Sequence, residues 1–181
     1  VIADLHTFIR ERNHPLHEVE TMSAHTVGDD EERIVEQVAS DDAAGVLLRF
    51  DNGARGTCTI SQVSAGRKNH NHWEIGGSSN AIAWDAERPG DLWMGHRGRA
   101  NELHQRDPGL LHPIAAATAL FPAGHVEGYP DTFRALFSEV YHHIAAGGPV
   151  HFPTFEDGLR SLRVCDAVAR SAATGAWASV D

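Results

Sequence analysis

A β-hairpin signal in the first third of the chain constrains the fold more than any other feature. The apolar run Ala44–Phe50 leads into Asp51-Asn52-Gly53, and residues 54–63 continue as an alternating run. Asn-Gly between two such runs is a strong hairpin signal, because a tight turn needs residues that tolerate positive φ. One face of the second strand carries Thr57, Thr59 and Ser61, and the other carries Cys58, Ile60 and Gln62. We therefore expect an antiparallel sheet with one semi-polar face.

Further strands are expected on both sides of this hairpin, joined by short turns. Arg10–Pro15 is expected to be a charged turn, and Glu18–Val27 is compatible with extended backbone. The other expected strands are Val1–Ile9, His72–Gly76, Ala81–Trp84, Leu92–Met94 and Asn101–Gln105. Roughly the first hundred residues thus have the pattern of a meander.

Two amphipathic helices are expected in the remainder. Apolar residues from Phe133 to Ile144 recur at helical spacing, with Pro130 in the first turn and Gly147 after the last. A second helix begins at Thr154 with a capping-box pattern to Asp157. Strands first and helices last indicate the α+β class: an open, mostly antiparallel sheet with helices packed on one face.

Composition excludes several function classes. The 181 residues carry a formal net charge of -10, which argues against nucleic acid or an anionic membrane as partner. No apolar run reaches the length of a membrane span. Cys58 and Cys165 stand apart and outside any CxxC, so we expect both to be reduced and buried, in a cytoplasmic protein.

The loop Gly124–Asp131 is the most informative site signal. Two glycines bracket His125 and Glu127, and a helix is expected directly behind them. A neutral imidazole can both donate and accept hydrogen bonds, which suits a ligand rich in hydroxyl groups. The alternative, a plain helix entry with a solvated histidine, is equally compatible with the pattern. Glu127 either orients His125 or caps the helix.

A second candidate is the basic turn Arg67-Lys68-Asn69, which follows a strand end and could bind hydroxyls or a phosphate. A solvated turn is the alternative. The 13 histidines show no HExxH or CxxC spacing, so we assign no metal ligands. There is no GxGxxG loop for a dinucleotide and no GxSxG elbow for a nucleophilic serine.

Taken together, segments along nearly the whole chain resemble one family in order. They are Ala3–Phe8, Asp51–Gly56, Ser61–Asn69, Trp73–Ser78, Trp84-Asp85 with Glu87–Pro89, Asp91–Trp93, Gly124–Tyr129 and Glu156–Leu162. These segments resemble the C-terminal domain of the Gfo/Idh/MocA oxidoreductases, a dihydrodipicolinate-reductase-like fold. Two positions depart from the pattern: the turn Gly77–Asn80 lacks the second glycine after its serine, and Val126 replaces the usual Pro or Gln.

The resemblance implies that residues 1–181 are a single substrate-binding and oligomerisation domain, with an NAD(P)-binding Rossmann domain upstream. It implies an oxidoreductase acting on a CH-OH group of a sugar, inositol or related polyol. The family's catalytic lysine, aspartate and histidine would all precede Val1, so this chain alone should bind no NAD or NADP and catalyse no reaction. The implied substrate-binding residues are His125, Arg67, Lys68, Asn69 and Glu127. A homo-oligomer, such as a dimer, would form through the open sheet face.

Two other functions remain open from the sequence. One is a stand-alone, non-catalytic carbohydrate-binding or assembly module. The other is a metal hydrolase built on the histidines, which the missing ligand spacing disfavours.

Overall fold

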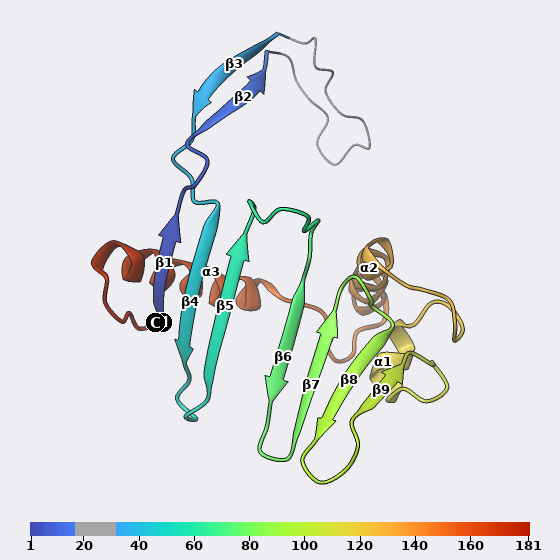
Figure 1. The fold of residues 1–181 in the computed structure, drawn as a ribbon. Helices are drawn as coiled ribbons and strands as arrows, with labels where there is room; N and C mark the ends of the chain where they lie inside the picture. The colour runs from blue at the N-terminus through green and yellow to red at the C-terminus, as the bar shows by residue number, and fades with distance from the viewer. Residues whose placement is uncertain (17–31) are drawn as a thin grey trace. The chain divides into compact units, whose positions relative to one another are not determined.

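The computed structural model describes residues 1–16 and 32–181 of the chain (Figure 1). The chain divides into two compact units, Val1–Ala65 with Thr154–Asp181, and Gly66–Pro153. The strands are β1 Ile2–His6, β2 Glu11–Pro15, β3 Arg33–Gln37, β4 Ala43–Arg49, β5 Arg55–Ser61, β6 His72–Gly76, β7 Asn80–Asp85, β8 Asp91–His96 and β9 Glu102–Gln105. The helices are α1 Pro113–Thr118, α2 Tyr129–Ala146 and α3 Phe155–Thr174. The predicted α+β class is confirmed, because the described strands pair only antiparallel and helices dominate the second half.

The central hairpin is confirmed as β4 and β5 of a three-stranded sheet in the order β1-β4-β5. Gly53 has φ +88°, a conformation that favours glycine, and the Asn52 side chain accepts from the backbone N–H of Ala54 at 3.0 Å. The Asn-Gly pair therefore closes the hairpin for the reason the sequence suggested.

The strand register places Val46 and Leu47 on opposite faces of the sheet. Val46 lies opposite Cys58 and is only 7% exposed, whereas its neighbour Leu47 lies opposite Thr57 and is half exposed. Residues directly opposite each other in an antiparallel pair point to the same face. The semi-polar row that contains Thr57 thus lies on the face away from buried Val46.

Helix α3 packs against β1 through a buried hydroxyl. Ser171 is fully buried; its Oγ accepts from the Ala3 N–H at 3.0 Å and donates to the Ala176 carbonyl at 2.7 Å. The segment after α3 then pairs with the start of the chain, because Ala178 and Val1 exchange two hydrogen bonds of 2.8 and 2.7 Å. This one side chain joins the helix, the edge strand and the C-terminal segment.

The prediction that Arg10–Pro15 is a turn is wrong, because Glu11–Pro15 forms β2 and pairs with the unforeseen strand β3. These two strands are an insertion between β1 and β4, so the first hundred residues are not one meander. Charged residues suit this hairpin because the described β3 residues are all exposed. The expected extended segment Glu18–Val27 lies outside the described residues.

Asp42 fixes the turn where the chain leaves β1. Its carboxylate accepts from the backbone N–H groups of Phe8 and Ile9, both at 2.9 Å, and its side chain is buried. These backbone hydrogen bonds lower the pKa of Asp42 below its ordinary value of 3.8, because they stabilise the charged form.

The second unit contains a true meander, β6-β7-β8-β9, at the expected positions. Strand β8 needs a residue without a side chain at Gly95. A Cβ at Gly95 would lie 2.4 Å from the ring of Trp93, which covers the same face two residues away. Short helix α1 was not foreseen from its Ala-rich sequence.

Both long helices begin where the sequence indicated, and α2 also ends where expected. Asp131 accepts from the N–H of Gly128 at the start of α2, and Gly147 ends that helix. Thr154 and Asp157 form the predicted capping box of α3, and Gly175 ends it with φ +66°.

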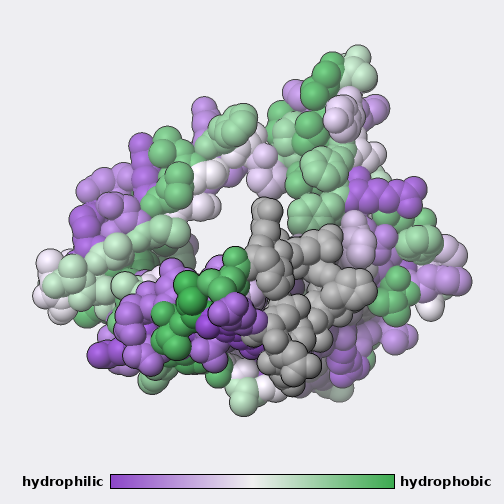
Figure 2. Space-filling view, turned by 90° about the horizontal axis from the view of Figure 1, so that it is seen from above, coloured by the Kyte–Doolittle hydropathy of each residue, from purple (hydrophilic) through white to green (hydrophobic). Residues whose placement is uncertain are grey.

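The surface carries many apolar side chains. Figure 2 shows hydrophobic and hydrophilic residues interspersed on the face turned to the viewer. The two cysteines are free, but the expectation that they are buried is wrong, because both are exposed. Among the described residues, no helix is both long and apolar enough to cross a membrane.

Replacing Ser171 should destabilise the first unit. Ser171→Ala removes the acceptor of the Ala3 N–H, so we expect a loss of about 1–3 kcal/mol in the free energy of unfolding. Chemical denaturation measures this loss. Ser161→Ala removes an exposed hydroxyl that donates to the Asp157 carbonyl within α3, and it should change stability by less than about 0.5 kcal/mol. Equal losses in the two variants would contradict the structural role of Ser171.

Asp42 should make the first unit acid-sensitive. The pKa of Asp42 is lower in the folded protein than in the unfolded chain. Its ionised carboxylate therefore stabilises the fold above the ordinary pKa, and this stabilisation is lost as the pH falls through the folded pKa. Asp42→Asn should therefore weaken the protein at pH 7 and flatten the loss of stability below about pH 4. Denaturation midpoints across this range provide the measurement. The exposed neighbour Asp41 supplies the control Asp41→Asn, and an unchanged acid slope in Asp42→Asn would refute the assignment.

Candidate functional site

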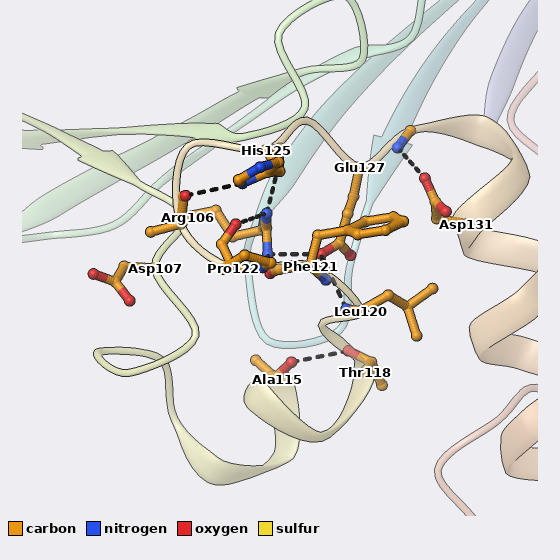
Figure 3. A network of polar contacts seen from close by, with 12 residues as sticks. Arg106, Asp107, Ala115, Thr118, Leu120, Phe121, Pro122, His125, Glu127 and Asp131 are labelled. Carbon is orange, nitrogen blue, oxygen red and sulfur yellow. Dashed lines mark hydrogen bonds and ion pairs between the residues drawn. The ribbon is translucent and has the colours of Figure 1, made fainter.

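The loop between α1 and α2 is held by Glu127 (Figure 3). The Oε1 atom of Glu127 accepts from the backbone N–H groups of Leu120 at 3.0 Å and Phe121 at 2.8 Å. The same oxygen lies 2.7 Å from Nη1 of Arg106. One carboxylate thus satisfies two backbone donors and a guanidinium.

Arg106, directly after β9, binds backbone carbonyl groups of the same loop. Its guanidinium donates to the carbonyls of Phe121 at 2.9 Å and Pro122 at 3.2 Å, and also to that of His125. The side chains of Arg106 and Glu127 are only 16% and 14% exposed. Water therefore screens the pair less than it screens a surface ion pair. We call this pair, with the backbone groups it binds, the Arg106–Glu127 clamp.

The clamp holds the backbone of His125 and leaves its side chain exposed. The only hydrogen bond of the ring among the described residues joins Nδ1 to the Ala123 carbonyl at 3.3 Å. Gly124 has φ +80° with open space where a Cβ would stand, so the corner before His125 requires a residue that tolerates the left-handed region. The outer nitrogen of the imidazole is free to bind a hydroxyl group of a ligand.

Glu127 neither caps α2 nor forms a hydrogen bond with the ring of His125. The N-terminal cap of α2 comes from Asp131, whose carboxylate accepts from Gly128 at 2.9 Å. Glu127 makes no hydrogen bond to the His125 ring, and acts on this residue only through Arg106 and the shared loop. Through its bonds to Arg106 and to the backbone, Glu127 acts as a positioning residue for the His125 loop.

The second candidate group lies in the loop before β6. Asn69 has φ +54°, which few residues other than glycine adopt but which asparagine tolerates. The guanidinium of Arg67 lies 3.9 Å from Oε2 of Glu87 and is exposed, as is Lys68. No hydrogen bond or ion pair between described residues connects this loop to the His125 loop.

A third polar cluster, unforeseen from the sequence, lies at the β8–β9 hairpin. His104 forms a hydrogen bond of 2.6 Å with Glu102, and Asn80 approaches His96 at 3.0 Å. The hydrogen bond from His104, and then the charges of Arg99 and the two histidines, lower the pKa of Glu102. This cluster connects the ends of β7, β8 and β9.

Breaking the clamp should release the His125 loop. Glu127→Gln keeps the volume but removes the charge beside Arg106, so we expect a loss of about 1–3 kcal/mol in unfolding free energy. Amide exchange at Leu120 and Phe121 should accelerate at the same time. Glu74→Gln, an exposed change on β6, is the control and should alter neither quantity. Unchanged exchange at both amides in Glu127→Gln would contradict the clamp.

The chain matches known proteins along its length. The family model described as "Oxidoreductase family, C-terminal alpha/beta domain" matches residues 14–180. Levoglucosan dehydrogenase of Pseudarthrobacter phenanthrenivorans is 31% identical over 143 residues, which cover 77% of this chain and 36% of that protein. The chain thus spans about a third of the length of this curated relative.

Solved structures agree with this match. A levoglucosan dehydrogenase in complex with NADH and L-sorbose is 28% identical, with a TM-score of 0.80 over 99% of this chain and 44% of that one. An inositol dehydrogenase homologue from Azotobacter vinelandii, in complex with NADH and myo-inositol, is 25% identical, with a TM-score of 0.69 over 76% of this chain and 38% of that one. The family match and these folds agree with the sequence resemblance. The chain belongs to the Gfo/Idh/MocA oxidoreductase family, as its C-terminal α/β domain.

Proposed function

We propose that this chain is the substrate-binding domain of an NAD(P)-dependent oxidoreductase that acts on a CH-OH group of a sugar, inositol or related polyol. The observation that carries the proposal is the family match over residues 14–180. The relatives whose structures hold NADH with L-sorbose or myo-inositol support the substrate class.

In this proposal the chain orients the substrate and a separate domain supplies the redox chemistry. Hydride transfer needs the carbinol carbon close to the nicotinamide and a base near its hydroxyl. The sequence has no GxGxxG loop, so the nucleotide and the catalytic base are assigned to an upstream Rossmann domain. Residues 1–181 then act as one substrate and oligomerisation domain, which alone binds no NAD or NADP.

His125 is the first residue we assign to substrate binding. Its backbone is fixed by the clamp while its ring stays accessible, a combination that favours recognition of a hydroxyl group. Arg67, Lys68 and Asn69 are assigned as further polar contacts, because two of them are cationic and all lie on an exposed loop. Glu127 contributes by holding the loop.

The open face of the β1-β4-β5 sheet is the surface we assign to a homo-oligomer. Leu47 is half exposed there, beside the semi-polar row that contains Thr57. An exposed sheet face with apolar residues is typical of an interaction surface. The free thiols of Cys58 and Cys165 favour a reducing, cytoplasmic location.

The test uses the full-length protein that contains this chain. Reduction of NAD+ and NADP+ is assayed with levoglucosan, L-sorbose, myo-inositol and a panel of related polyols. His125→Ala should lower kcat/KM by roughly tenfold to a hundredfold, because a hydrogen bond to substrate is lost. His142→Ala, an exposed histidine on α2, is the control and should leave kcat/KM unchanged.

Two results would overturn parts of this proposal. An unchanged kcat/KM in His125→Ala would remove that residue from the site while leaving the reaction class intact. Sugar binding without turnover on any substrate would instead favour the non-catalytic carbohydrate-binding module.

A further inference from the structure

A histidine and two carboxylates meet in the second unit, away from the His125 loop. They are His70 in the loop before β6, Asp85 at the end of β7 and Glu87 in the following turn. One ligand atom of each lies within 4.8 Å of the other two. The proposed function assigns no role to these three side chains.

The imidazole of His70 is aimed at both carboxylates but forms no hydrogen bond with either. Its Nδ1 atom lies 3.7 Å from Oδ1 of Asp85 and 3.6 Å from Oε1 of Glu87. This nitrogen is buried and makes no hydrogen bond, although the side chain as a whole is 22% exposed. A proton shared with one carboxylate would bring the two heavy atoms to about 2.7–3.0 Å. The nitrogen instead stands almost equally far from both.

The two separations from the imidazole fit an ion bound between His70 and the carboxylates. Zinc lies about 2.0–2.2 Å from nitrogen and oxygen ligands, which places two ligand atoms roughly 3.0–3.7 Å apart. The observed distances from Nδ1 match the upper end of that range. Ionised Asp85 and Glu87 supply two negative charges, and the nearby Arg67 supplies one positive charge at 3.9 Å from the other oxygen of Glu87. The local balance favours a cation.

The turn that carries the carboxylates is held by hydrogen bonds of its own. The Trp84 indole donates to the Pro89 carbonyl at 3.1 Å, and Oδ1 of Asp85 accepts from the Glu87 N–H at 2.9 Å. The loop is joined to this turn by a hydrogen bond of 2.9 Å from Ala86 N–H to the Asn71 carbonyl. Few degrees of freedom remain to be lost when an ion binds.

We propose that His70, Asp85 and Glu87 bind one divalent transition-metal cation of the zinc type, with water completing its coordination. One imidazole with two carboxylates suits zinc better than magnesium or calcium, which prefer oxygen ligands alone. The ion cross-links the 66–71 loop to the β7–β8 turn. It thereby fixes the backbone next to Arg67 and Asn69 and has no redox role.

The spacing rules applied to the sequence did not reveal this set. Known metal-binding motifs place their ligands at fixed offsets on one helix or hairpin. His70 instead precedes β6, and the two carboxylates lie at the end of the partner strand β7 and in the turn after it. His72, the first residue of β6, lies beside His70 with ring centroids 6.2 Å apart and planes nearly parallel.

The test titrates the metal-free full-length protein that contains this chain with Zn2+ by calorimetry, and with Co2+ by visible absorption as a report on the ligand set. We expect one ion per chain at the tightest site and a higher melting temperature in its presence. Asp85→Asn keeps an oxygen acceptor for the Glu87 N–H, so the turn should persist while affinity falls by at least about tenfold. Arg67→Gln removes the competing charge and should tighten binding.

Non-specific binding by the other histidines is the main alternative, and a matched variant separates it. His142→Gln removes an exposed imidazole on α2 and should leave the tightest site unchanged. The proposal fails if the wild-type chain takes up no stoichiometric ion. It also fails if His142→Gln weakens binding as much as Asp85→Asn does.

Discussion

The candidate substrate loop depends on the ion pair of Arg106 and Glu127. A loop without regular secondary structure leaves backbone donors and acceptors that must find partners when they are shielded from water. Glu127 binds two of the donors and Arg106 binds three of the carbonyls, with the charges of the two side chains facing each other. Guanidinium suits this task, because it offers five donors in a fixed plane and no acceptor. Lysine could not satisfy carbonyls spread along the loop from a single point charge.

The same physics explains how the first unit is held with so little apolar core. Among the described hydrophobic residues only Val46 and Ala167 are buried, and both lie in the first unit. Ser171, one turn after Ala167 in α3, and Asp42, just before β4, bind backbone N–H groups of β1 and the residues after it. A buried hydroxyl or carboxylate that lost these partners would carry the full cost of desolvation. Specific polar contacts therefore determine where β1 lies, in addition to hydrophobic burial.

Local signals in the sequence predicted most elements, and long-range contacts account for the errors. Asn52-Gly53 and the Thr154–Asp157 capping box act within a few residues, so their structures follow from local chemistry. The pairing of β1 with β4 across the β2–β3 insertion is a long-range contact without a local signal. Exposure of Cys58 depends on what covers its strand, which composition does not report. His125 and Glu127 lie close together in the sequence, but Arg106 lies 19 residues before His125 and no spacing rule connects it to them.

Because polar contacts fix the backbone of the loop, such a domain can change its ligand specificity through exposed side chains alone. Residues that touch a ligand are best placed on a loop whose backbone is fixed by other residues. Here the clamp binds main-chain atoms of the His125 loop, while the exposed ring and the neighbouring Val126 make no contribution to it. The exposed side chains can therefore be exchanged without removing the contacts that hold the loop. Substitution of Arg106 or Glu127 would instead move every residue of the loop together, so selection for a new ligand should act on the exposed side chains and preserve the clamp.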